Sequence, residues 1–63
     1  MKATIILTYN DESEICFDVI TREEPSKALA DVMIITRGTL MASSAERAVA
    51  YNEESFEICA YQK

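Results

Sequence analysis

The chain opens on two segments in which apolar and polar side chains alternate, the pattern of strands that bury one face. Residues 3–9 and 14–20 are rich in β-branched and aromatic residues, and the polar run 10–13 between them has the composition of a hairpin turn. One face of this predicted hairpin collects the apolar side chains of Ile5, Leu7, Ile15, Phe17 and Val19. We expect this face to lie in the core.

A helix is predicted from Pro25 to about Ala42. Thr21 and Glu24 have the spacing of a capping box, and Pro25 suits the first helical turn. We expect the helix to continue through Gly38, at a cost of about 1 kcal/mol relative to alanine. Apolar residues recur in it at three- and four-residue spacing and form a stripe of Leu29, Val32, Met33, Thr36 and Leu40. This stripe should cover the sheet.

A repeated sequence indicates the structure of the last third of the chain. The segment 9–16 reappears almost unchanged as 51–59, with Phe56 as the one insertion. The match indicates two copies of one local structure, so we expect a second hairpin with Phe56 in its turn or in a β-bulge. The predicted strands of this hairpin are 47–51 and 55–61.

Residues 43–51 taken alone fit a helix as well as a strand. Ser43 and Glu46 form a second capping-box pattern, whereas residues 48–51 fit the alternation of a strand. The repeat favours the strand. The sequence therefore predicts an α+β fold, a small single domain over residues 1–63, with a four-stranded antiparallel sheet in the order β-β-α-β-β and one helix packed on one face.

Acidic residues outnumber basic ones by 11 to 6, which gives a formal net charge of −5. The mean field of the protein therefore attracts basic surfaces and repels phosphate, so direct binding to nucleic acid is disfavoured. Because the two hairpin turns fall at opposite ends of the predicted sheet, the turn acids divide into two groups. The first group is Asp11, Glu12 and Glu14, and the second is Glu23, Glu24, Glu53 and Glu54.

The side chains that most enzymes need are missing from the sequence. It has no histidine, which excludes a Ser-His-acid relay and a Cys-His pair. A single glycine cannot form a glycine-rich phosphate loop. The acids of segment 11–14 lack the ligand spacing of a calcium loop. We therefore expect no catalysis, no cofactor and no metal site.

The two cysteines, Cys16 and Cys59, lack the spacing of a zinc site or a redox pair. We expect buried free thiols rather than a disulfide, as in a reducing compartment. No segment reaches the ~18–20 consecutive apolar residues of a membrane span, and no small-residue cleavage site follows the first residues. The expected location is the cytoplasm, without contact to a membrane.

Two apolar surfaces are expected to remain after the helix has covered one face of the sheet. The open face of the sheet should carry Ile6, Cys16, Ile20, Cys59 and Tyr61. The side of the helix opposite the core stripe presents a helix strip, defined as Ala30, Ile34, Arg37 and Met41. Scattered surface hydrophobic residues, which are normal on any protein, are the competing interpretation of both surfaces.

These features favour a non-enzymatic protein that acts by binding another macromolecule. The first hypothesis is an inhibitor whose acids, named above in two groups, imitate phosphates and occupy a basic nucleic-acid groove on a host protein. In length, charge and lack of catalytic residues the chain is similar to small acidic proteins of phages and mobile elements, including many anti-CRISPR proteins, although no motif is shared. The alternative is a homodimeric structural or regulatory module, assembled through the open sheet face or through Ile34, Arg37 and Met41 of the helix strip.

Overall fold

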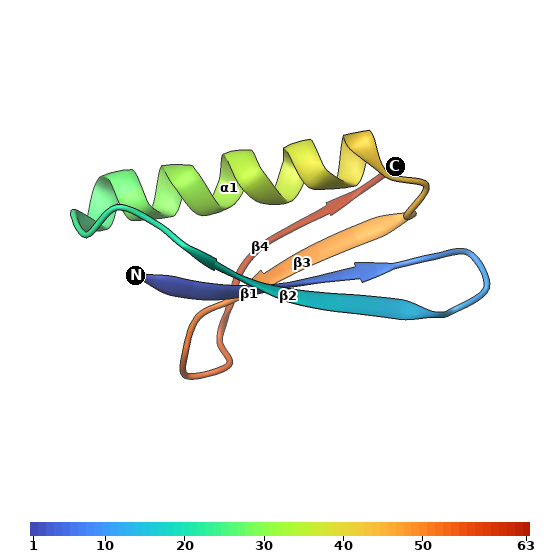
Figure 1. Cartoon of the computed structure of the whole chain (residues 1–63), viewed down its shortest axis with the longest axis horizontal. Coiled ribbons are helices and arrows are strands. Elements are labelled where there is room, and N and C mark those ends of the chain that lie inside the picture. The colour runs from blue at the N-terminus through green and yellow to red at the C-terminus, as the bar shows by residue number, and fades with distance from the viewer.

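The computed structural model describes all 63 residues. The chain forms five elements, which are β1 (Lys2–Thr8), β2 (Glu14–Ile20), α1 (Pro25–Ala42), β3 (Arg47–Tyr51) and β4 (Glu57–Gln62). The strands make one antiparallel sheet in the order β2-β1-β3-β4, and the helix lies along one face of it (Figure 1). The predicted α+β fold with the order β-β-α-β-β is confirmed, including the strand at 47–51.

The core lies between β1, β3 and the helix. Ile5 at the centre of β1 faces Phe17 on β2 and Ala50 on β3. Nine apolar residues are buried, and they are Ala3, Ile5, Leu7, Ala28, Val32, Leu40, Ala45, Ala48 and Ala50. Five of these nine are alanines, which bury little apolar area each. The core is therefore thin, and its stability depends on a few large side chains.

The helix begins and ends where the sequence predicts, but its start has no capping box. Glu24 is the N-cap residue and makes no side-chain cap hydrogen bond. The Thr21 hydroxyl instead donates to the carbonyl oxygens of Met1 and Arg22, both at 3.1 Å. The Thr21 backbone N–H also donates to Met1, at 2.8 Å, so this residue extends the β1–β2 ladder and cannot cap the helix. The helix runs through Gly38 to Ala42 as expected.

The buried stripe of the helix is narrower than the sequence pattern predicts. Its buried residues follow one another at four-residue spacing and are Ala28, Val32, Thr36 and Leu40. Leu29 and Met33 were expected in the same stripe, but they are 47% and 41% exposed. The thin core offers these two side chains no complete cover, so the prediction that they are buried is wrong.

The two hairpins close with the same five-residue geometry, but one residue out of step with the sequence repeat, which aligns Tyr9 with Tyr51 and not with Asn52. In the first, the Tyr9 N–H donates to the Ser13 carbonyl at 2.9 Å; in the second, the Asn52 N–H donates to the Phe56 carbonyl at 2.9 Å. The fourth residue of each turn, Glu12 or Ser55, has a positive φ of 70° or 68°. Both turns therefore combine a type I turn with a left-handed residue.

The inserted Phe56 has a defined structural place. It closes the second turn at the position that Ser13 occupies in the first. The extra residue of the hairpin is absorbed by a register shift between Ala50 and Tyr51, where Ala50 faces Cys59 while Tyr51 already faces Glu57. The prediction that Phe56 belongs to a turn or a bulge is confirmed, and the bulge leaves Ile58 without a partner in the ladder.

Candidate interaction surfaces

Strand β2 is covered less than the sequence predicts. A four-stranded sheet measures about 14 Å between its outer strands, whereas a helix is only about 10 Å wide with its side chains. Helix α1 packs on β3 and β4 and reaches β1, which leaves β2 at the margin. As a result Phe17 and Val19 are only half-buried, and Ile15, expected in the core, is 52% exposed.

The open face of the sheet is less apolar than expected. Ile6, Cys16 and Ile20 lie on it, because their neighbours on the strands point to the helix side. Cys59 and Tyr61 do not, since they face Ala50 and Ala48, which are buried beneath the helix. The bulge at Ala50/Tyr51 shifts the alternation of β4, so the predicted placement of these two residues is wrong.

A polar network lies on the β1–β2 half of the open face. Asp18 accepts a hydrogen bond from the Thr4 hydroxyl at 2.8 Å and lies 3.5 Å from the Lys2 ammonium group. The Thr4 hydrogen bond, with a smaller contribution from the charge of Lys2, lowers the pKa of Asp18. A shallow hollow of about 380 Å³ lies beside this network and is lined by Lys2, Thr4, Ile6, Asp18, Tyr51, Asn52, Glu53 and Ser55. These polar groups make the open face a poor apolar interface.

Both cysteines are free thiols, but only one is sheltered. Cys59 is half-buried, and this burial raises the pKa of its thiol, although a hydrogen bond with the Thr36 side chain counteracts the rise. Cys16 is exposed. The expectation that Cys16 is buried is wrong because its side chain lies on the open face of the sheet, which no other element covers.

The first acidic turn, defined as Asp11, Glu12 and Glu14, is fully exposed. Asp11 accepts hydrogen bonds from the backbone N–H and the hydroxyl of Ser13, at 3.0 and 2.6 Å, and these bonds lower its pKa. The other two carboxylates make no ion pair. The turn therefore presents three negative charges on a backbone that local hydrogen bonds hold in place.

A further acid, Glu46, joins this end of the molecule. Its backbone N–H donates to the Thr8 carbonyl at 2.8 Å, just before the first acidic turn, and its side chain is exposed. Sequence analysis did not place it there. The signal that could have found it is the pairing of β1 with β3, which brings residues 46 and 8 together only after the strand order is known.

The second group of acids lies at the opposite end of the long axis, divided between two sides of the sheet (Figure 1). The second acidic turn, defined as Glu53 and Glu54, projects on the open side, and neither side chain makes an ion pair. Glu23 and Glu24 lie at the helix start on the other side. Glu23 is 3.9 Å from the N-terminal ammonium group, and Glu24 is 3.4 Å from the Lys27 ammonium group.

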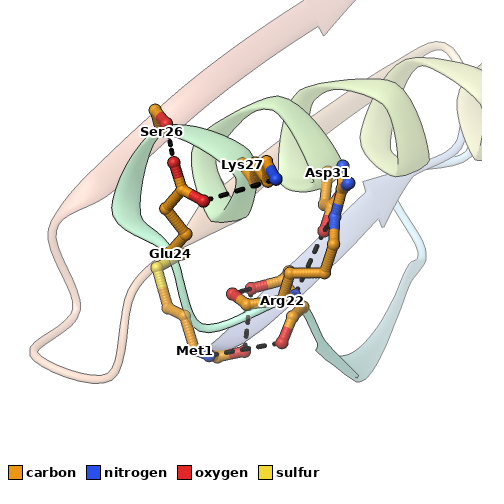
Figure 2. Close-up of polar contacts among 7 residues, drawn as sticks. Met1, Arg22, Glu24, Ser26, Lys27 and Asp31 are labelled. Atoms are coloured by element: carbon orange, nitrogen blue, oxygen red, sulfur yellow. Dashed lines mark hydrogen bonds and ion pairs between the residues drawn. The ribbon is translucent and has the colours of Figure 1, made fainter.

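The negative charge at the helix start is thus partly neutralised by nearby cations (Figure 2). Besides the Lys27 contact, Glu24 accepts a hydrogen bond from the Ser26 hydroxyl at 3.3 Å. Beside it, the Arg22 guanidinium forms a two-point ion pair with Asp31. Seven acids have no cation partner, and five of them belong to the two acidic turns; the other two, Glu46 and Glu57, lie next to these turns.

The helix strip is exposed as predicted. Ile34 and Met41 are 69% and 66% exposed, and Arg37 between them makes no ion pair. This strip lies on the outer side of α1, whereas the acidic turns lie at the two ends of the sheet and the second of them projects on the open side (Figure 1). The structure thus does not combine the strip and the turns into one surface.

No family model, curated protein or solved structure matches the chain. The single helix is not long and apolar enough to cross a membrane. The structure brings no three side chains together that could hold a metal ion.

Proposed function

We propose that the protein is a non-enzymatic binding module whose acidic turns occupy a basic, nucleic-acid-binding surface of another protein. The observation that carries this proposal is the distribution of unpaired carboxylates. Lys2, Arg22 and Lys27 each contact an acid elsewhere in the chain, whereas Glu12, Glu14, Glu53 and Glu54 contact no cation. A small acidic inhibitor of the kind made by phages and mobile elements, including anti-CRISPR proteins, would work in this way.

The turns suit such a role because their charges are exposed and their backbones are held. Each turn is closed by two backbone hydrogen bonds, and side-chain oxygens of Asp11 and Asn52 accept further N–H groups within them. Holding a charged group before binding lowers the entropy that binding costs. The two turns are separated by a strand of about 23 Å, so they can contact two separate basic patches of one partner.

Salt dependence and charge variants test this function together. The tagged protein is incubated with host lysate at low and high salt, next to the variants Glu12→Gln/Glu14→Gln and Glu53→Gln/Glu54→Gln. A partner that binds the acids is expected to be retained at low salt only and to be lost with at least one double variant, because these attractions are screened. Retention that is indifferent to salt would contradict the proposal.

A matched control tests whether binding of the partner depends on the position of the acids or only on the net charge of the protein. The double variant Ala30→Lys/Gly38→Lys also raises the net charge by two, but it acts on the outer side of α1. Ala30 is exposed, and a side chain added at Gly38 meets no atom within 4 Å. This control is expected to retain the partner. Its failure to do so would mean that overall charge, and not the acidic turns, governs binding.

A second candidate function is a homodimeric structural or regulatory module assembled through the helix strip. The observation that favours it is the exposure of Ile34 and Met41 on a regular helix face. The open sheet face, which was the other expected interface, is less suited because the polar Lys2–Asp18–Thr4 network lies on its β1–β2 half. If the strip is the interface, Ile34→Lys will convert a dimer to a monomer in light scattering, whereas an unchanged mass rejects this interface.

A further inference from the structure

The outer edge of β2 carries unpaired backbone groups at every second residue. At the two ends of the β1–β2 ladder, Tyr9 bonds to Ser13 and Thr21 bonds to Met1. Along an antiparallel ladder, hydrogen-bonded residue pairs alternate with pairs that are not hydrogen-bonded. Between these two ends, the residues of β2 that bond to β1 are therefore Ile15, Phe17 and Val19. The N–H and C=O groups of the other residues point away from β1. These residues are Glu14, Cys16, Asp18 and Ile20.

Nothing within the chain covers this edge. β2 is the outermost strand of the sheet and seven residues long, and most of its side chains are exposed. Edge strands that avoid pairing usually carry charged side chains, above all lysine, or proline or a bulge. The only charges on β2 are Glu14 and Asp18, and Asp18 lies 3.5 Å from the Lys2 ammonium group. β2 contains no basic residue and no proline, and its pairing with β1 is regular throughout. An extended strand of matching length would satisfy the free backbone groups.

The charges on β2 select one pairing between two copies. Two antiparallel β2 strands can bond through their outward groups in three central registers. In the first register Cys16 lies opposite Cys16 of the second copy, and Glu14 then faces Asp18. In the second register Asp18 lies opposite Asp18 of the second copy, so two aspartates face each other. Like charges directly opposite are destabilising. In the third register Phe17 lies on the two-fold axis, Cys16 faces Asp18, and Glu14 faces Ile20, so no acid faces an acid.

This third register also matches the apolar side chains. Phe17 lies opposite Phe17 of the second copy, and Ile15 lies opposite Val19. These are non-bonded pairs, in which side chains come closest, at about 4.5 Å between Cα atoms. All three residues lie on the helix side of the sheet and are the ones that α1 leaves partly uncovered. The same register therefore satisfies the free backbone groups, keeps the acids apart and places the apolar side chains against each other.

We propose that two copies of the chain pair through the β2 edges in this register and form one continuous sheet of eight strands. The two-fold axis is perpendicular to the sheet, so both helices lie on the same face. Pairing adds cover to Phe17 and Val19, which pack against a core built largely of alanines. It also doubles the acidic turns, so that a partner with repeated basic patches can be bound at more than one point.

This inference goes beyond the proposed function and can fail independently of it. Each copy carries a net charge of −5, so the copies repel each other and salt should strengthen their pairing. Salt is expected to weaken the binding of a basic partner. The two interactions therefore respond to salt in opposite directions, and each can be measured without the other.

Opposite charges placed at Cys16 test the register. The side chain of Cys16 is exposed and faces Asp18 of the second copy in the proposed pairing. Cys16→Lys places an ammonium group opposite that carboxylate, and Cys16→Asp places a second carboxylate there. Because each dimer contains two such contacts, we expect the dissociation constant to fall about tenfold with lysine and to rise about tenfold with aspartate.

The measurement is sedimentation equilibrium from micromolar to millimolar protein, with circular dichroism to check folding. Ser44→Lys is the control, since it adds the same charge as Cys16→Lys at an exposed residue outside β2 and the helix strip, and it should change self-association much less. Cys16→Pro is the second variant, because the Cys16 N–H does not bond to β1; the folded variant is expected to be monomeric. A wild-type protein that stays monomeric at every concentration overturns the proposal, and weaker pairing with lysine overturns the register.

Discussion

Arg22 and Asp31 form a two-point ion pair that ties the loop after β2 to the second turn of the helix (Figure 2). Nε donates to Oδ2 at 3.0 Å and Nη2 donates to Oδ1 at 2.6 Å, while the Arg22 backbone N–H donates to Oδ2 at 3.1 Å. Together these bonds lower the pKa of Asp31 to about 2. The pair adds a polar contact to the packing of α1 on the sheet.

The Arg22–Asp31 pair predicts a pH-dependent part of the stability. The pKa of Asp31 is lower in the folded protein than its usual 3.8, so its contribution to the free energy of unfolding is complete above about pH 4 and is lost as the pH falls through about 2. Asp31→Asn is expected to be less stable than the wild type at neutral pH and to lose less stability across this window. Urea denaturation at several pH values measures both effects.

The control for this experiment is Glu53→Gln. Glu53 is an exposed acid that makes neither a hydrogen bond nor an ion pair through its side chain. The variant should retain the wild-type loss of stability in acid. If Asp31→Asn and Glu53→Gln respond to pH in the same way, the Arg22–Asp31 pair is not the cause.

Glycine at the left-handed turn positions is expected to stabilise the protein. Glu12 and Ser55 have φ values of 70° and 68°, a conformation that side chains with a Cβ adopt at a cost. Because glycine also makes the unfolded chain more flexible, Glu12→Gly and Ser55→Gly should each gain only about 0.5–1 kcal/mol. Thermal denaturation would show a higher midpoint for both variants, whereas Asn10→Gly, at a position without positive φ, should not be stabilised.

The thin core predicts a large difference between two neighbouring residues of the helix. Leu40 is buried and Met41 is 66% exposed. Leu40→Ala leaves a cavity and is expected to cost about 2–5 kcal/mol, enough to unfold much of a small domain. Met41→Ala should change stability by less than about 0.5 kcal/mol. Comparable effects in urea denaturation would show that Leu40 is not part of a packed core.

The fold could be predicted because local patterns and the repeat agree. Alternation defined β1 and β2, and Pro25 marked the start of the helix. The repeat of the first turn resolved residues 43–51 in favour of a strand, which their own sequence left open. That inference succeeded because both turns close with the same hydrogen bonds, although Asn52 takes the place of Tyr9.

The surfaces were harder to predict, because they depend on where the elements lie in space. Sequence alternation assigned a face to Ile15, but it could not show that the helix lies over β3 and β4 and leaves β2 uncovered. The bulge at Ala50/Tyr51 reversed the faces of Cys59 and Tyr61. The spacing of Thr21 and Glu24 predicts a helix cap, but nothing in the sequence shows that Thr21 bonds to Met1 instead.

The central claim is that the acidic turns take the place of nucleic acid on a basic partner, and competition tests it most directly. A protein retained from host lysate on the immobilised chain at low salt is challenged with increasing amounts of duplex DNA or RNA. Nucleic acid is expected to release this protein in a dose-dependent way, and Glu12→Gln/Glu14→Gln or Glu53→Gln/Glu54→Gln is expected to retain little of it at the start. A retained protein that stays bound in excess nucleic acid would contradict the proposed function.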